Sequence, residues 1–249
     1  MIGETFFKIG SLTIYTYGFF VMLAVLATSL IIYLLAQKAK LQKTVIFDLV
    51  IYALLFGIIG ARITFYALYS DQFSSFWDIF KIWQGGLVSW GGFIFGIVAA
   101  VVVLKIYKEN TLKWLDILAI SSLLGLSIGR FGSFLSGELA GLPFNGLFSV
   151  SGVYPVTLYE SLFLLVVFFI WLIFYLNFRL KATPGIFGLG VLATYSLGRF
   201  LIDFFRQESD VFAGINLGQL FSVMILFISI IVFMMYIISK KKGPENVIS

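Results

Sequence analysis

The chain has 249 residues, of which 61% are hydrophobic and only 12% are charged, and its formal net charge is +5. A soluble domain is typically about half apolar and about a quarter charged, so this composition excludes an ordinary cytosolic enzyme, a disordered protein and a small disulfide-bonded secreted domain. The chain contains neither cysteine nor histidine. We therefore expect no disulfide, no thiol nucleophile and no metal site, and we expect no cofactor.

Seven long apolar runs follow one another along the chain. They cover residues 15–37, 45–69, 86–107, 114–135, 154–177, 184–205 and 216–239. Each is long enough to cross about 30 Å of hydrocarbon at about 1.5 Å per residue. The first run is too long for the apolar part of a cleaved signal peptide, and only Lys8 precedes it. The sequence therefore predicts an all-α integral membrane protein with seven transmembrane helices. We expect one polytopic domain over 1–239 and a basic cytoplasmic tail over 240–249.

The basic residues between the apolar runs indicate the orientation of the chain. Alternate connections and the tail hold eleven of them: Lys38, Lys40, Lys43, Lys105, Lys108, Lys113, Arg179, Lys181, Lys240, Lys241 and Lys242. The opposite connections hold three: Lys8, Lys81 and Arg206. The positive-inside rule then predicts an N-terminus outside and a C-terminus in the cytoplasm, in agreement with an odd number of spans. This distribution accounts for the net charge, so we expect no nucleic-acid partner.

Two local patterns add detail to this arrangement. The connection over residues 70–85 combines Phe and Trp residues with Asp71, Asp78 and Lys81, a composition typical of a short helix at the membrane interface. Glycines recur four residues apart at Gly92/Gly96 and at Gly125/Gly129. This spacing indicates close packing between helices.

Three arginines lie inside apolar runs, where an arginine is costly unless it is paired or hydrated. Arg62, Arg130 and Arg199 each lie five to seven residues from the outer end of their run. Other polar residues fall at similar depth: Tyr17, Ser89, Trp90, Glu138, Glu160 and Asp203. The sequence therefore predicts one polar pocket in the outer half of the membrane, lined by Arg130, Arg199, Arg62, Glu138 and Tyr17. A fitting ligand is an anionic phospholipid head group, because the guanidinium fork matches phosphate oxygens.

Simpler structural interpretations remain open for two of these arginines. Arg199 and Asp203 are four residues apart on one predicted helix and would form a salt bridge there. Arg62 would extend its side chain to the outer interface. Arg130 lies between two glycines, which permit close backbone approach to a ligand.

The segment around Arg130 resembles the signature of the prolipoprotein diacylglyceryl transferase family, roughly Gly-Arg-x-Gly-Asn-Phe-x-Asn-x-Glu-x-x-Gly. Here residues 129–141 read GRFGSFLSGELAG. Five further segments are similar to family motifs in the same order: 15–18 (YTYG), 60–66 (GARITFY), 85–92 (GGLVSWGG), 154–160 (YPVTLYE) and 198–206 (GRFLIDFFR), with a last Gly-Gln at 218–219. The resemblance covers nearly the whole chain and implies seven helices with the N-terminus outside.

The chain departs from the family pattern at its amide and imidazole positions. Trp90 and Tyr154 stand where the family has His, Ser133 and Ser136 where it has Asn, and Thr157 where it has Gln. The arginines, Glu138 and Glu160 are retained. The departures thus affect the expected reaction more than the expected ligand.

The resemblance implies a membrane enzyme that transfers the diacylglyceryl group of phosphatidylglycerol to the lipobox cysteine of a secreted prolipoprotein, whose signal peptide would be its partner in the bacterial cytoplasmic membrane. Glycerol 1-phosphate would leave and a thioether would form. The implied catalytic residues are Arg130, Arg199, Glu138 and Tyr17. The implied substrate-binding residues are Arg62, Ser133, Ser136, Gly141, Trp90, Tyr154, Glu160, Tyr195, Asp203 and Arg206.

The base that forms the thiolate is left open. Trp90 does not accept a proton, so Tyr17, Tyr154 or Glu160 would replace the family histidine, or no dedicated base would be used. Two other functions also stay open: a divergent paralogue that uses phosphatidylglycerol with another acceptor, and an inactive phospholipid-binding protein. We predict weak transfer to a standard lipobox peptide, with phosphatidylglycerol binding preserved.

Overall fold

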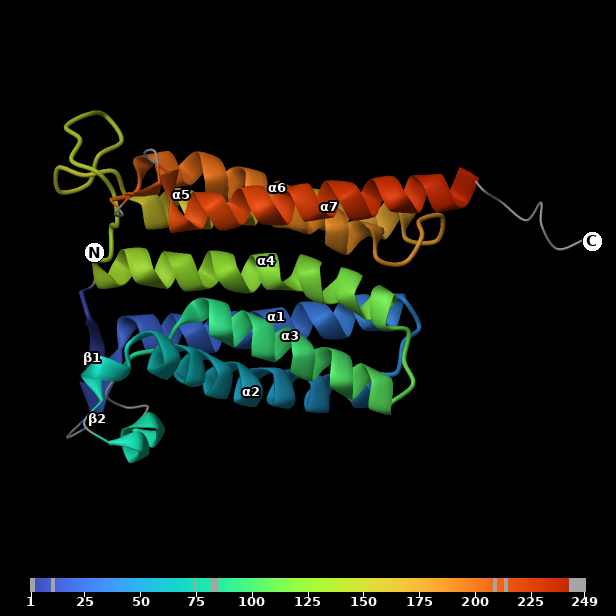
Figure 1. Ribbon diagram of the computed structural model, residues 1–249, viewed down its shortest axis with the longest axis horizontal. Helices are drawn as coiled ribbons and strands as arrows, with labels where there is room; N and C mark the ends of the chain where they lie inside the picture. Colours follow the sequence, from blue (N-terminus) through green and yellow to red (C-terminus); the bar gives the residue numbers. More distant parts are fainter. Residues whose placement is uncertain are drawn as a thin grey trace, which may run out of the picture. The chain divides into compact units, whose positions relative to one another are not determined.

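Seven long helices form most of the protein in a computed structural model that describes residues 3–9, 12–73, 75–81, 85–207, 210–212 and 215–241. Their bounds are α1 Thr16–Lys38, α2 Thr44–Leu68, α3 Ser89–Ile106, α4 Thr111–Ser136, α5 Val156–Phe178, α6 Ile186–Ile202 and α7 Leu217–Lys241 (Figure 1). All seven contain a stretch long and apolar enough to cross a membrane. The seven-helix prediction is confirmed.

Short elements lie at the ends of the helices. Strands β1 (Thr5–Ile9) and β2 (Leu12–Tyr15) form an antiparallel hairpin before α1, and β3 (Asp210–Phe212) pairs with β4 (Ile215–Asn216) before α7. The sequence analysis did not predict either hairpin. Where it predicted one short helix over 70–85, the chain forms two 3-10 helices, η1 (Ser70–Gln72) and η2 (Phe76–Phe80). A third, η4 (Asp203–Phe205), extends α6.

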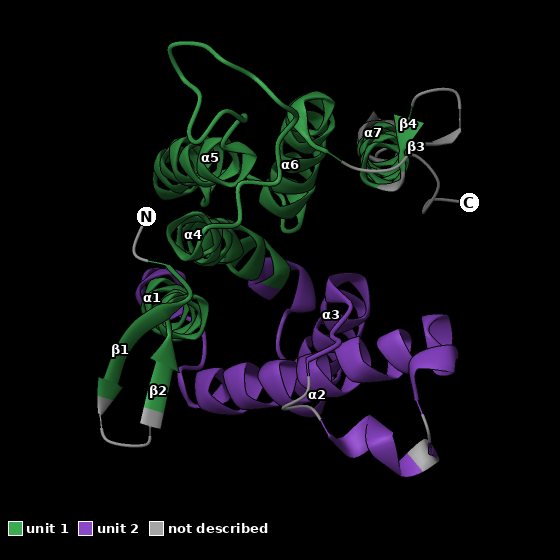
Figure 2. Ribbon diagram, turned by 90° about the vertical axis from the view of Figure 1, so that its left-hand side faces the viewer, with its two compact units in different colours: residues 1–31, 115–249 green, residues 32–114 purple. Residues whose placement is uncertain are grey.

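The chain folds into two compact units (Figure 2). One contains residues 1–31 and 115–249, and the other contains residues 32–114. The single domain over 1–239 stays a prediction. Of the expected basic tail, residues 240 and 241 end α7, and residues 242–249 lie outside the described part of the chain.

In the second unit, glycines set the separation between α2 and α3. A Cβ atom at Gly92 would lie 3.3 Å from the carbonyl oxygen of Gly57, and one at Gly96 would lie 3.2 Å from that of Ala53. A Cβ atom at Gly91 would overlap the side chain of Thr64. The close packing predicted for Gly92/Gly96 is confirmed, because glycine lets the two backbones approach.

In the first unit, glycines and buried polar groups hold α4, α5 and α6 together. A Cβ atom at Gly125 would overlap the side chain of Thr28 on α1, whereas one at Gly129 would meet nothing within 4 Å, so the predicted packing role holds for Gly125 alone. Ser127 on α4 and Ser161 on α5 each donate a hydrogen bond to the other's carbonyl oxygen, at 2.8 and 2.9 Å. These bonds keep the buried hydroxyls satisfied where no water is available.

The buried carboxylate of Asp116 on α4 fixes the start of α6. It accepts hydrogen bonds from the backbone N–H groups of Gly185 and Gly188, both at 2.7 Å. Gly185 has a φ of +94°, a conformation that favours glycine. A carboxylate at a helix N-terminus satisfies otherwise unpaired N–H groups, and here it holds α6 against α4.

Candidate functional site

Five charged side chains gather where α4, α5, α6 and η4 meet in the first unit. Arg130 comes from α4, Glu160 from α5, Arg199 from α6 and Asp203 from η4, and Arg206 follows η4. They form a connected set of ion pairs. We call these five residues the charged cluster.

Glu160 is the centre of the charged cluster. Its Oε2 lies 3.0 Å from Nε of Arg130, and its Oε1 accepts hydrogen bonds from Arg199 and, at 2.6 Å, from Nη2 of Arg206. The Glu160 side chain is only 5% exposed. One carboxylate therefore joins arginines from three separate segments, and it compensates charges that would otherwise be costly to bury.

Asp203 is the second anion of the charged cluster, and its side chain is fully buried. Its Oδ2 lies 3.1 Å from Nε of Arg199, and its Oδ1 accepts a 3.1 Å hydrogen bond from Nε of Arg206. A Cβ atom at Gly218, near the start of α7, would lie 2.6 Å from Asp203 Oδ2. Glycine at 218 is therefore required for Asp203 to reach both arginines.

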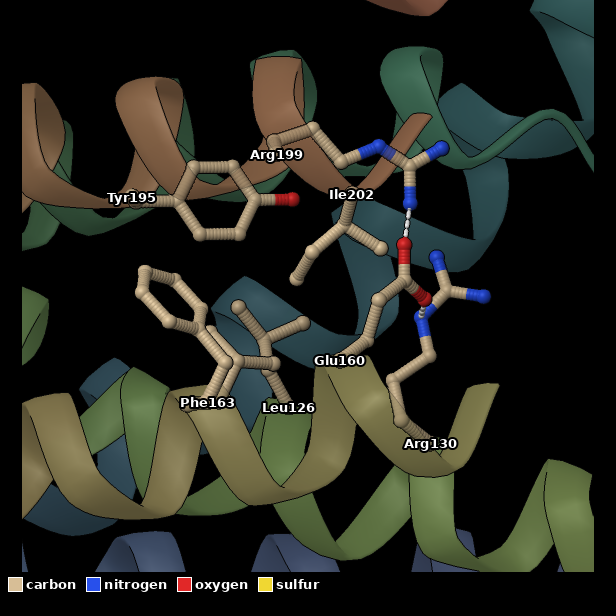
Figure 3. Close-up of a pocket in the computed structure, with 8 residues that line it drawn as sticks. Leu126, Arg130, Glu160, Phe163, Tyr195, Arg199 and Ile202 are labelled. Carbon is tan, nitrogen blue, oxygen red and sulfur yellow. Dashed lines mark hydrogen bonds and ion pairs between the residues drawn. The ribbon is translucent and has the colours of Figure 1, made fainter. Parts of the chain in front are cut away.

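A pocket opens beside the charged cluster, between an apolar wall and the ion pairs (Figure 3). Its lining residues are Leu126, Arg130, Glu160, Phe163, Leu164, Tyr195, Arg199 and Ile202. The Tyr195 hydroxyl points along the pocket toward the charged side chains (Figure 3). The ring of Phe163 occupies the space that a side chain at Gly198 would need, so this glycine permits α5 to approach α6 beside Arg199. The cavity is about 20 Å³, enough for about one water molecule.

In the described part of the chain, three guanidiniums of the charged cluster face two carboxylates. The guanidinium nearest to solvent is that of Arg130, whose side chain is 32% exposed, against 16% for Arg199 and 7% for Arg206. Among the residues that the structure describes, no acceptor bonds the terminal nitrogens of Arg130, whereas its Nε faces Glu160 (Figure 3). Arg130 therefore keeps N–H donors for an anionic ligand.

The loop that follows α4 is bonded to the segment that carries Arg206. Gly141 and Arg206 form an isolated antiparallel bridge, and the backbone N–H of Leu142 donates to the carbonyl of Phe205 at 2.9 Å. A Cβ atom at Gly141 would overlap the carbonyl of Tyr154. The ring of Tyr154 stacks on Phe144, with centroids 4.1 Å apart. Gly141 and Tyr154 thus support the segment that positions Arg206.

The two serines that replace family asparagines lie at the end of α4. Ser133 is buried, and its carbonyl oxygen accepts a hydrogen bond from Ser136 Oγ at 2.8 Å and from the N–H of Glu138 at 3.0 Å. Thr157 Oγ1 donates to the carbonyl of Glu138 at 2.6 Å. The backbone of Glu138 is thus fixed, while its side chain is exposed and lies outside the pocket. Tyr17 is 53% exposed and is not a lining residue either.

Arg62 belongs to the second unit, where it binds backbone rather than a counter-ion. Its guanidinium donates to five carbonyl oxygens at 2.5–3.1 Å, those of Asp78, Ile79, Lys81, Gly85 and Gly86. The side chain is buried and lines a separate polar pocket of about 480 Å³. A guanidinium has five N–H donors, so these bonds engage all of them.

Of the five residues predicted to share one pocket, namely Arg130, Arg199, Arg62, Glu138 and Tyr17, Arg130 and Arg199 line this pocket, and one pocket for all five stays a prediction. The structure brings Arg130 and Arg199 together with Glu160, Tyr195, Asp203 and Arg206, all of which were candidates. Trp90, the second residue of α3, is 39% exposed and belongs to the second unit. The apolar wall of the pocket was not predicted, because its residues look like any other apolar helix residues in the sequence. They are Leu126, Phe163, Leu164 and Ile202.

Comparisons with known proteins find relatives that match most of the chain. Phosphatidylglycerol–prolipoprotein diacylglyceryl transferase 1 of Clostridium perfringens is 31% identical over 256 residues, which cover 97% of each chain. The phosphatidylglycerol–prolipoprotein diacylglyceryl transferase of Clostridium botulinum is 32% identical, covering 95% of this chain and 97% of its own. That of Listeria monocytogenes is 31% identical, covering 90% and 86%. A sequence profile described as prolipoprotein diacylglyceryl transferase matches residues 4–235, and this chain belongs to that family.

Proposed function

We propose that this chain transfers the diacylglyceryl group of phosphatidylglycerol to a cysteine thiol of a prolipoprotein. The relatives are bacterial enzymes named for this reaction, and seven apolar helices make the chain a multi-pass protein of the bacterial cytoplasmic membrane. The observation that carries the proposal is the charged cluster. Its three guanidiniums, and above all the terminal N–H groups of Arg130, suit the negative charge of a phosphodiester.

The reaction makes one bond and breaks one bond. The thiolate sulfur attacks the glyceryl carbon that carries the phosphate, and a C–S bond forms as the C–O bond to that phosphate breaks. The oxygen keeps the electron pair, so glycerol phosphate leaves, and the thiol proton passes to a base or to solvent. The phosphodiester begins with one negative charge, and the departing phosphomonoester carries up to two.

This increase in charge indicates how the arginines would accelerate the reaction. Interactions that strengthen as negative charge develops lower the barrier, whereas equal binding of substrate and transition state does not. Arg130 would bind the phosphate first through its terminal nitrogens. Arg199 lies next to it on the other side of Glu160 (Figure 3) and would stabilise the leaving phosphate.

A phosphate does not fit the pocket as it stands, because about 20 Å³ accommodates about one water molecule. We therefore expect lipid binding to move Arg130 away from Glu160, and the phosphate to take the place of this carboxylate in front of the guanidinium. While the phosphate binds Arg130, Glu160 would still neutralise the positive charges of Arg199 and Arg206. Its carboxylate thus holds the arginines ready before the lipid arrives.

The reaction also needs a group that accepts the thiol proton, and the charged cluster is poorly placed to supply one. Both oxygens of Glu160 face guanidiniums, so they are poorly placed to take a thiol proton. Tyr17 is exposed, and the ring of Tyr154 stacks on Phe144 and meets Phe205 edge-on. Trp90 has no acceptor. These placements favour low transfer activity, and they keep a lipid-binding paralogue with another acceptor as the second candidate function.

The prolipoprotein acceptor would bind to this chain through its signal peptide. The chain's apolar helices expose large side chains over much of their length, for example Leu162, Val166 and Phe169 on α5, at 51–58%. A signal peptide is itself an apolar segment. It would reach the site through the membrane, beside helices of the same character.

One experiment tests both the ligand and the reaction. The full chain in nanodiscs is given labelled phosphatidylglycerol and a lipobox peptide, and mass spectrometry follows the thioether peptide and glycerol phosphate. We expect Arg130→Lys to lower both binding and transfer by about 100-fold, since a Lys ammonium cannot supply a guanidinium fork. The matched control is Arg179→Lys, at the end of α5, which should retain both. Equal effects of the two variants would refute the assignment of Arg130.

A further inference from the structure

We infer that the loop over residues 139–155 is a membrane anchor whose tip, Leu147 and Phe148, inserts into the lipid leaflet next to the site. Leu147 is 98% exposed and Phe148 is 77% exposed. Two adjacent large apolar side chains at this exposure are unusual for a loop that faces water. The inference requires only that the chain is a membrane protein and does not depend on the proposed reaction.

The composition of the loop supports lipid rather than water as its surroundings. No Asp, Glu, Lys or Arg occurs between Glu138 and Glu160. Both flanking helices, α4 and α5, are membrane-spanning candidates, so the loop begins and ends at the membrane surface. Exposed apolar side chains also occur on α5, for example Leu162.

Part of the backbone of the loop is paired within the loop itself, which lowers the cost of lipid contact. The N–H of Phe144 donates to the carbonyl of Gly152 at 2.9 Å, and Val150 and Val153 exchange hydrogen bonds at 3.0 and 3.2 Å. At the tip, the N–H and Oγ of Ser149 both donate to the carbonyl of Gly146, at 3.0 and 2.8 Å. These bonds close the turn that carries Leu147 and Phe148.

A hydrogen bond from the adjoining helix also fixes the tip. The Tyr159 hydroxyl on α5 donates to the carbonyl of Phe148 at 2.9 Å. Figures 1 and 2 both show this loop beyond the end of α5 and reaching outward from α5 and α6. In both views the loop extends away from the helices of its own unit.

The shape of the tip favours lipid over the apolar segment of an acceptor peptide. Peptides bind in concave grooves or along free strand edges, whereas Leu147 and Phe148 project from a tight turn. Such a projection inserts among lipids in the way that interfacial aromatic and aliphatic residues do. The base of the loop is bridged to Arg206 through Gly141, so insertion would also hold the charged cluster at a fixed depth.

The test uses spin labels in a chain that has no cysteine of its own. Leu147→Cys is labelled in nanodiscs that contain phosphatidylglycerol, and its accessibility to oxygen is compared with that to an aqueous nickel complex. Leu162→Cys on α5 serves as the lipid reference, and Asp71→Cys in η1 as the aqueous reference. Thermal unfolding checks that each labelled protein remains folded.

We expect the ratio of oxygen to nickel accessibility at residue 147 to be severalfold higher than at residue 71 and to approach that at residue 162. A ratio equal to that at residue 71 would overturn the inference. A high ratio that appears only after a lipobox peptide is added would overturn it as well, because the occupant would then be the peptide. No transfer activity enters the measurement, so failure of the proposed reaction would leave this result unaffected.

Discussion

At the scale of single residues, Glu160 links three arginines that come from different parts of the chain. Its carboxylate faces Arg130, Arg199 and Arg206 and is almost fully buried. Removing one partner from a buried ion pair is destabilising because it leaves an uncompensated charge in a medium of low polarity. The stability of the first unit should therefore depend on this one side chain more than on any exposed acid.

The substitution Glu160→Gln tests this dependence. We expect it to lower the free energy of unfolding by about 3–5 kcal/mol, since three arginines, two of them mostly buried, lose a counter-ion. The matched control is Glu138→Gln, whose side chain is exposed and which should change stability by less than about 0.5 kcal/mol. Thermal unfolding in detergent measures both. Equal shifts for the two variants would show that Glu160 has no special role in stability.

Trp90 is one of the residues at which this chain departs from the family pattern, where the resemblance implies a histidine. Trp90→His should raise transfer to a lipobox peptide by at least about 10-fold, because a positioned general base typically contributes about 10²–10⁴-fold. Phosphatidylglycerol binding should stay unchanged. The control is Trp77→His in η2, which adds an imidazole at a position that is 71% exposed. Full activity of the unmodified chain, with no gain from Trp90→His, would show that the reaction needs no imidazole there.

At the scale of elements, Arg62 holds the connection between α2 and α3 by its backbone. Its five carbonyl acceptors lie between residues 78 and 86, a segment with few other regular hydrogen bonds among its described residues. We expect Arg62→Lys to raise amide hydrogen exchange in this connection by about 10-fold or more, because an ammonium has three donors and cannot reach all five oxygens. Trp90 follows this connection directly, so transfer should fall as well.

The control for Arg62 is Lys81→Gln in the same connection. Lys81 pairs only with the nearby Asp78, at 2.6 Å, and is 44% exposed, so its loss should leave exchange nearly unchanged. If Arg62→Lys leaves exchange unaltered too, the five hydrogen bonds do not hold the connection. Arg62 would then be available for the lipid-binding role that the sequence predicts.

The sequence predicts the helices well because membrane-spanning runs are long and uniform in composition. Their observed ends differ from the predicted ones by only a few residues, as at α2, where 45–69 became Thr44–Leu68. The hairpins were missed because strands of two to five residues leave little periodicity to detect. The predicted interfacial segment over 70–85 contains the short helices η1 and η2. The binding of its carbonyls by Arg62 was not predicted, because a side chain that binds backbone leaves no signature in the sequence.

Part of the candidate site was predictable from the positions of its residues in the apolar runs. Arg130, Arg199 and Glu160 fall at similar depth in their spans, and depth can be read from position in a run. The pairing of Glu160 with Arg206 joins residues 46 positions apart, and it depends on how α5 meets the segment after α6. Tyr17 and Glu138 have a similar depth but are exposed and do not line this pocket, a difference that depth alone does not predict.

At the scale of the whole molecule, the remaining prediction is the orientation of the seven helices in the membrane. Eleven basic residues in alternate connections and the tail against three in the others predict an outside N-terminus. This orientation places the charged cluster and the 139–155 loop toward the outer leaflet, where a secreted precursor would be met. Both the reaction and the anchor would take their lipid from that leaflet.

Labelling of single cysteines by a membrane-impermeant maleimide tests the orientation in intact cells. We expect Asp71→Cys, in the exposed 3-10 helix η1, to react from outside, and Leu180→Cys, 89% exposed between α5 and α6, to react only after the membrane is permeabilised. The native chain has no cysteine, so it provides the background. The distribution of Lys and Arg determines which connections cross the membrane and which stay in the cytoplasm. The reversed labelling pattern would therefore place the charged cluster in the inner leaflet. It would contradict an outer-leaflet source of phosphatidylglycerol.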